Sequence, residues 1–135
     1  MREKAGVHGT VLLVEDGKTY AELATVLLTD LGWTVLHAST AEEAIRVAHN
    51  APPDLILMDV NLPGMDGLRA IRVLREDPRT KSIPAIALTG DTRPGDEEWR
   101  KAIASGFDKH ETKPITRSAF RALTAPFIGR AGKAS

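Results

Sequence analysis

Apolar residues along the chain follow two patterns that alternate. Short runs without internal polar positions, such as residues 11–14 and 55–58, are typical of strands buried on both faces of a parallel sheet. Between such runs, apolar positions recur at helical spacing, most clearly over residues 17–31, where Gly32 provides a C-terminal stop. Alternating strands and helices predict one α/β domain with a parallel sheet, helices on both faces and right-handed crossovers.

The same patterns predict where each element lies. Strands are expected at residues 10–15, 34–37, 54–59, 83–89 and 107–112, and helices at about 17–31, 40–49, 67–76, 95–105 and 116–125. Thr40 and Glu43 form a predicted capping box. Three arginines of the third helix are expected on its solvated face: Arg69, Arg72 and Arg75. The predicted organisation is a flexible N-terminus (1–9), one domain (10–126) and a flexible tail (127–135).

Carboxylates follow two of the predicted strands. Glu15 and Asp16 end the first strand, and Asp59 ends the third, just before a turn rich in proline and glycine. If these strands are neighbours, the three carboxylates share one pocket. Two unit charges about 4 Å apart repel by roughly 4 kcal/mol at an effective dielectric near 20, so the cluster implies a raised pKa or a bound cation. Oxygen ligands with open water positions favour magnesium.

Two further polar residues end the later strands. Thr89 follows the fourth apolar run, and Lys113 precedes a proline after the fifth strand. The carboxyl ends of parallel strands are where open α/β sheets place their ligands. Carboxylates, a hydroxyl and an ammonium at one edge indicate a metal-assisted anion site, and phosphate is the natural anion.

Composition narrows the class of protein. The chain has 135 residues, of which 42% are hydrophobic and 27% charged, which fits one globular domain. Eighteen basic residues balance eighteen acidic ones, so no overall field favours nucleic acid or a membrane surface. The absence of cysteine excludes disulfides and thiol catalysis. Because no apolar run approaches the roughly 18 residues of a membrane span and no signal-peptide core is present, a cytoplasmic protein is expected.

With these residues at its strand ends, the chain resembles a response-regulator receiver domain of two-component signalling, the CheY-like family. The resemblance extends from about residue 10 to residue 125. The resemblance implies a doubly wound, flavodoxin-like (βα)5 domain with sheet order 2-1-3-4-5. It also implies a stand-alone receiver that takes a phosphoryl group from a histidine kinase or a histidine phosphotransfer protein. Such a domain is a signalling module, not an enzyme, although it assists its own Mg²⁺-dependent phosphorylation and dephosphorylation.

The resemblance also implies a magnesium site around the phosphoacceptor. Asp59 would accept the phosphoryl group and contribute a carboxylate to Mg²⁺. Asp16 would bind the ion directly, and Glu15 would act through metal-bound water. Asn61 would lend its backbone carbonyl. The acidic pair here is Glu-Asp instead of Asp-Asp, a variant that leaves the direct metal ligand intact.

Other family roles fall on the later strand ends. Thr89 would turn its hydroxyl towards the phosphoryl group, Lys113 would bind a phosphoryl oxygen, and Pro114 would hold a cis bond. Asn61 and Asp91, each two residues beyond Asp59 or Thr89, would tune how fast the acyl phosphate decays. A carboxylate and an amide can orient water, so the acyl phosphate is expected to decay faster than in a variant with apolar residues at both positions.

The family's switch aromatic is replaced in this chain. His110 stands where Tyr or Phe is usual, so it would move inward when Thr89 moves; the alternative is a histidine exposed on an edge strand. The output face of the fourth helix, fifth strand and fifth helix carries a group of basic residues: Arg100, Lys101, Lys109, Arg117 and Arg121. This face would suit an acidic downstream protein or a phosphorylation-dependent homodimer. No direct nucleic-acid or membrane partner is expected.

Two other functions remain open at this point. A phosphohydrolase of the haloacid dehalogenase type also phosphorylates a strand-end Asp, but it needs a general acid two residues later, where this chain has Asn61. A receiver-like module that is not phosphorylated and serves only interactions is the second alternative. Nucleotide binding is disfavoured, because neither glycine-rich phosphate-binding motif follows the first strand.

Overall fold

The computed structural model describes residues 8–90 and 96–128 of the chain. Two expectations lie partly outside this part: residues 1–7 of the flexible N-terminus predicted at 1–9, and residues 129–135 of the flexible tail predicted at 127–135. Asp91 lies outside it as well.

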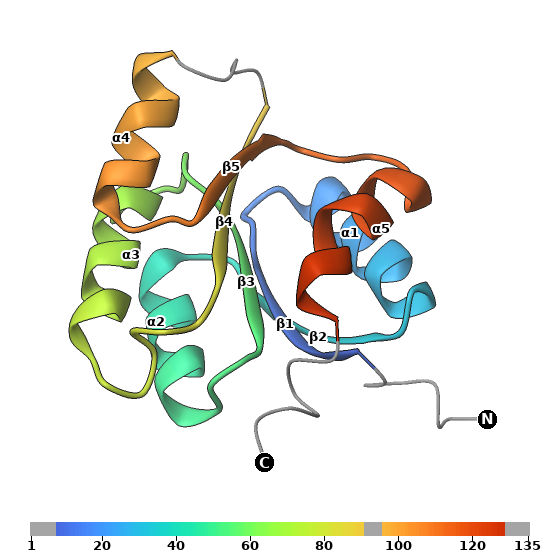
Figure 1. Ribbon diagram of the computed structural model, residues 1–135, viewed down its shortest axis with the longest axis horizontal. Helices are drawn as coiled ribbons and strands as arrows, with labels where there is room; N and C mark the ends of the chain where they lie inside the picture. The colour runs from blue at the N-terminus through green and yellow to red at the C-terminus, as the bar shows by residue number, and fades with distance from the viewer. Residues whose placement is uncertain (1–7, 91–95, 129–135) are drawn as a thin grey trace.

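Five parallel strands form one sheet with the order β2-β1-β3-β4-β5 (Figure 1). The strands are β1 (Gly9–Val14), β2 (Trp33–Ala38), β3 (Leu55–Asp59), β4 (Ala85–Thr89) and β5 (Lys109–Thr112). The expected doubly wound α/β fold and its strand order are confirmed. Because β1 and β3 pair directly, with Val14 opposite Met58, the residues that follow these two strands emerge side by side.

Helices cover both faces of the sheet. In Figure 1, α1 (Lys18–Asp30) and α5 (Arg117–Thr124) lie on one side, whereas α2 (Ala41–Asn50), α3 (Gly67–Glu76) and α4 (Glu97–Ser105) lie on the other. A short 3₁₀ helix, η2 (Ala125–Phe127), follows α5 directly. Within the described residues, no helix has the length and apolar character needed to cross a membrane.

Side-chain caps fix where the helices begin. Thr40 accepts a hydrogen bond from the backbone N–H of Glu43, which confirms the first half of the predicted capping box. The reciprocal bond differs, because Oε1 of Glu43 accepts from the N–H of Ser39 and not from that of Thr40. The N-cap residues of α3, α4 and α5 bond in the same way to the third residue of their helices: Asp66, Asp96 and Thr116. Among the described residues, four of the five α-helices therefore begin at a side-chain cap, whereas Gly17 before α1 provides none.

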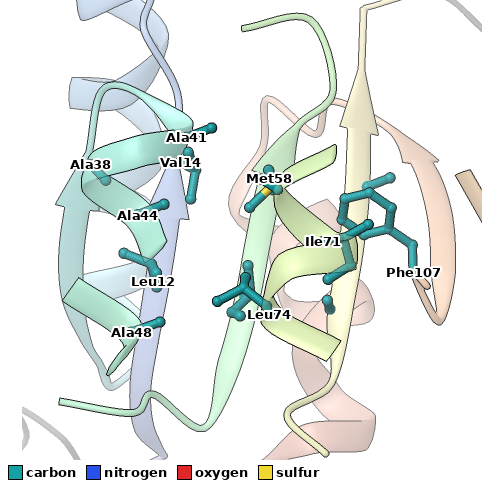
Figure 2. Close-up of a cluster of buried hydrophobic side chains, with 14 of the residues drawn as sticks. Leu12, Val14, Ala38, Ala41, Ala44, Ala48, Met58, Ile71, Leu74 and Phe107 are labelled. Carbon is teal, nitrogen blue, oxygen red and sulfur yellow. The ribbon is translucent and has the colours of Figure 1, made fainter. Parts of the chain in front are cut away.

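The sheet separates two hydrophobic clusters. Figure 2 shows the one beneath α2, α3 and α4, where Leu12 and Val14 lie beside the small alanines of α2 and Phe107 lies beside Ile71 of α3. The other cluster lies beneath α1 and α5. It includes Leu13 and Leu57 of the sheet, Leu28 of α1 and Phe120 of α5. All five residues of β3 are buried. This two-sided burial explains why the central strand shows no polar alternation.

The prediction that all three arginines of α3 point into solvent is wrong for Arg75. Arg75 is half-buried, and its guanidinium donates to the backbone carbonyls of Ile83 at 2.7 Å, Gly106 at 2.9 Å and Lys81 at 3.0 Å. It also pairs with Asp108 at 3.1 Å. A planar guanidinium with five donors suits several converging acceptors. Arg75 therefore ties α3 to the chain segments that precede β4 and β5.

Candidate functional site

Three carboxylates converge at the carboxyl ends of β1 and β3. One carboxylate oxygen from each of Glu15, Asp16 and Asp59 lies within 4.8 Å of the others. Glu15 and Asp59 are buried, with exposed fractions of 4% and 5%, whereas Asp16 is exposed. The sequence predicted this cluster correctly, because β1 and β3 are neighbours with aligned ends.

Lys113 bridges the two buried carboxylates. Its Nζ lies 2.8 Å from Oε1 of Glu15 and 3.0 Å from Oδ2 of Asp59. Burial by itself lowers the pKa of Lys113, but the hydrogen bonds to Glu15 and Asp59 outweigh it and raise the pKa above its ordinary value. The side chain is therefore an ammonium at neutral pH. Its backbone is fixed as well, since the N–H of Lys113 donates to the carbonyl of Thr89 at 2.7 Å.

Backbone N–H groups orient both buried acids. The N–H of Asn61 donates to Oδ1 of Asp59 at 2.8 Å, so each oxygen of Asp59 has a defined partner. The N–H of Gly17 donates to Oε2 of Glu15 at 2.9 Å. Behind Asp59, Gly67 packs so closely that a Cβ there would lie 2.8 Å from Cα of Val60. The loop after β3 is therefore tightly packed where it carries Asn61.

The donor set fits a hard divalent cation. All three candidate side chains offer carboxylate oxygens, the ligand type that magnesium prefers. Both oxygens of Glu15 already accept hydrogen bonds. In residues 8–90 and 96–128, the carboxylate of Asp16 has no hydrogen-bond or ion-pair partner, so it is the acid best placed to bind an ion directly. The cluster of three carboxylates could thus hold a metal ion.

Thr89 and His110 lie on the neighbouring strands. Thr89 is the last residue of β4, which pairs with β3, and it is 1% exposed. His110 lies on β5 opposite Ala87 and is 6% exposed. The alternative of a histidine exposed on an edge strand is therefore wrong. The His110 ring is already buried in this structure, so it does not need to move in from the surface.

The surroundings of His110 affect its charge. Burial lowers its pKa from the ordinary value, against the opposing influence of Asp96, Glu98 and Glu111, which favour the charged ring. The carbonyl of His110 accepts a hydrogen bond from the indole N–H of Trp99 at 3.1 Å. This bond links α4 to β5 along the edge of the sheet.

One residue beside the site was not predicted from the sequence. The hydroxyl of Tyr20, in the first turn of α1, donates to the carbonyl of Pro114 at 2.7 Å, and its ring lies under Nζ of Lys113, 5.0 Å from the ring centre. Helical spacing marked Tyr20 only as one of the apolar positions of its helix.

The expectation of a cis bond at Pro114 is wrong, because no peptide bond of the described residues is cis.

The fold and this site define the class of protein: a doubly wound α/β domain with an acidic pocket and an ammonium at the carboxyl ends of its strands, as in receiver domains. Residues 11–125 match the family model described as the response regulator receiver domain. The chain belongs to this family.

Individual relatives agree with the family. The polar-differentiation response regulator DivK of Brucella ovis is 32% identical over 122 residues, which cover 90% of this chain and 98% of DivK. The chemotaxis protein CheY4 of Vibrio cholerae superposes with a TM-score of 0.81 at 28% identity, covering 88% of this chain and 98% of that one. The receiver domain of a Pseudomonas aeruginosa sensor histidine kinase, solved with a magnesium ion in its active-site cleft, has a TM-score of 0.80 at 31% identity, covering 90% and 98%.

These similarities decide between the functions that the sequence left open. The chain is a receiver of two-component signalling, and its acidic pocket is consistent with a metal ion and with phosphorylation of an aspartate. The phosphohydrolase and the interaction module that is never phosphorylated are not favoured.

Proposed function

We propose that Asp59 is the phosphoacceptor of this receiver and that a histidine kinase or histidine phosphotransfer protein is the donor. The observation that carries the proposal is the position of Asp59, a buried strand-end carboxylate with one oxygen 2.8 Å from the N–H of Asn61 and the other 3.0 Å from Nζ of Lys113. In the transfer, a carboxylate oxygen of Asp59 bonds to phosphorus while the bond from phosphorus to the donor imidazole nitrogen breaks. The imidazole leaves with a proton from solvent.

Four residues would hold Mg²⁺ in this proposal. Asp16 and Asp59 would supply carboxylate oxygens, Asn61 its backbone carbonyl, and Glu15 would act through bound water. When bound, the ion neutralises negative charge on the carboxylates and on the phosphoryl oxygens.

Lys113 and Thr89 would complete the phosphoryl site. Lys113 remains charged and lies within 3.0 Å of Asp59, so its ammonium can follow a phosphoryl oxygen once Asp59 is esterified. Thr89 ends the strand next to Asp59 and would donate its hydroxyl to another phosphoryl oxygen. This chemistry concerns the chain's own phosphorylation and dephosphorylation, and we assign no separate enzymatic activity.

Asn61 and Asp91 would set the lifetime of the phosphoryl group. Asn61 is exposed beside Asp59, where its amide can orient an attacking water. We expect an Asn61→Met, Asp91→Ala variant to lose its phosphoryl group more slowly than the wild type. Equal decay rates in the two proteins would exclude this role.

The donor protein would dock beside Asp16. Val26 on α1 is exposed to 65% and lines the same cavity as Asp16. Ile115, two residues after Lys113, is also exposed to 65%. Exposed apolar side chains of this kind would suit contact with a protein donor that must bring one imidazole to Asp59.

The signal would leave through the face formed by α4, β5 and α5. Its basic side chains are Arg100, Lys101, Lys109, Arg117 and Arg121. Lys101 pairs with Glu97 and Arg117 with Asp30. This group of basic side chains would suit an acidic protein partner or a phosphorylation-dependent homodimer. Thr89 and His110 would transmit phosphorylation to this face.

Incubation with acetyl phosphate tests the function without knowledge of the kinase. The wild type is expected to gain about 80 Da, the mass of one phosphoryl unit, in the presence of Mg²⁺ and not after chelation. Asp59→Asn should gain nothing, whereas the exposed control Asp30→Asn should behave as the wild type. A gain that persists in Asp59→Asn would contradict the assignment.

A further inference from the structure

Tyr20 contacts the site from the opposite side of Lys113. The Lys113 ammonium is enclosed by Glu15 at 2.8 Å, Asp59 at 3.0 Å and the Tyr20 ring, whose centre lies 5.0 Å away. Cations within about 6 Å of an aromatic ring centre are attracted by its electron-rich face. The carboxylates therefore fix the ammonium on one side, and the ring limits where it can move on the other.

The hydroxyl of Tyr20 holds the same segment by its backbone. It donates to the carbonyl of Pro114 at 2.7 Å, a contact between residues 94 positions apart in the chain. The backbone of Lys113 is tied on its other side to the carbonyl of Thr89 at 2.7 Å. One side chain thus contacts both the ammonium of Lys113 and the carbonyl of the next residue.

We infer that Tyr20 is a positioning residue for Lys113, which keeps the ammonium aimed at the oxygen that Asp59 presents to the phosphoryl group. The inference rests on the proposed function, because it assigns Tyr20 a role in that phosphoryl site. Burial, followed by the nearby charges of Glu15 and Asp59, raises the pKa of Tyr20. Its hydroxyl therefore stays protonated and remains a donor throughout the neutral range.

Binding of beryllofluoride, which mimics a phosphoryl group on a carboxylate, tests this role in a double-mutant cycle. The proteins are wild type, Tyr20→Leu, Lys113→Ala and the double variant, with Mg²⁺ present throughout. Tyr20→Leu is expected to weaken beryllofluoride binding about fivefold, the effect of losing a half-buried cation–π contact. In the Lys113→Ala background the same change should have no further effect, because Tyr20 acts through the ammonium.

Tyr20→Phe separates the two contacts, since it keeps the ring and loses the bond to Pro114. Its affinity is expected to lie between those of wild type and Tyr20→Leu, and its thermal unfolding reports whether the fold is intact. An equal loss from Tyr20→Leu in both Lys113 backgrounds would overturn the inference and leave Tyr20 a purely structural residue. The inference would also be overturned if Tyr20→Leu bound beryllofluoride as tightly as the wild type does. Failure of the wild type to bind would instead contradict the proposed phosphoryl site.

Discussion

The ammonium nitrogen of Lys113 lies 3.0 Å from Oδ2 of Asp59, so a residue after β5 neutralises a carboxylate at the end of β3. The same nitrogen lies 2.8 Å from Glu15. One positive charge therefore serves two buried carboxylates, and Asp16 adds a third nearby. The three carboxylates therefore outnumber the ammonium, and a bound cation would offset the excess negative charge.

Replacing Lys113 with methionine should destabilise the protein when Mg²⁺ is absent. Glu15 and Asp59 would then face each other without a cation, which we expect to lower the free energy of unfolding by about 2 kcal/mol. Added Mg²⁺ should restore much of this loss, because a ligand that binds only the folded state stabilises it. Urea unfolding with and without Mg²⁺ measures both effects. A Lys113→Met protein as stable as the wild type in chelator would contradict this reasoning.

Gly67→Ala should disturb the loop that carries the site. A Cβ at residue 67 would lie 2.8 Å from Cα of Val60 and 2.9 Å from the carbonyl oxygen of Asp59, and backbone atoms cannot rotate away. We expect a loss of about 1–3 kcal/mol in the free energy of unfolding. Gly90→Ala is the matched control, since a Cβ there meets nothing within 4 Å. Similar unfolding midpoints for the two variants would show that the loop relaxes without cost.

Arg75 and Arg69 allow a comparison within one helix. Arg75→Met removes donors from the carbonyls of Ile83 and Gly106, and we expect a loss of about 2 kcal/mol in the free energy of unfolding. Arg69 is exposed, and its side chain has no hydrogen-bond or ion-pair partner among the described residues, so Arg69→Met should cost under about 0.5 kcal/mol. Chemical denaturation compares them directly. Equal losses would mean that the Arg75 bonds contribute nothing beyond those of a surface arginine.

His110 should make the stability of the protein depend on pH. Because its pKa is lowered in the folded state, the unfolded chain binds the proton more readily, and stability falls as pH drops from about 6.5 towards the lowered pKa. Asp96, Glu98 and Glu111 oppose this loss only in part. His110→Phe lacks the group, so its unfolding free energy should fall less between pH 7 and pH 5, roughly the range of histidine titration. Parallel pH profiles for the two proteins would show that burial of His110 has no such effect.

Local patterns predicted most of the fold. Apolar runs located β1, β3 and β4, whereas β5 is a polar strand without such a run. Thr40 marked a helix start that the structure confirms. The limits of one strand differ from the prediction, since β5 begins at Lys109 and not at Phe107. The side chain of Asp108 bonds to Arg75 and to the N–H of Ala85, a tertiary contact that no local pattern encodes.

The acidic cluster was predictable because strand ends meet at one edge of a parallel sheet. Neither the position of Tyr20 nor that of Arg75 was, since both depend on contacts between distant segments. Tyr20 reaches Pro114 across 94 residues, and Arg75 reaches Gly106 across 31. Arg75 follows the same spacing as Arg69 and Arg72, and its contacts with the segments before β4 and β5 distinguish it from them.

Identification of the phosphorylated residue tests the central claim most directly. After treatment with acetyl phosphate and Mg²⁺, borohydride reduces an aspartyl phosphate to homoserine, which peptide mass spectrometry can locate in the chain. We expect homoserine at residue 59 and unchanged aspartate at residue 16. Homoserine at any other position, or none at residue 59 in a protein that has gained a phosphoryl group, would contradict the assignment of Asp59 as the phosphoacceptor.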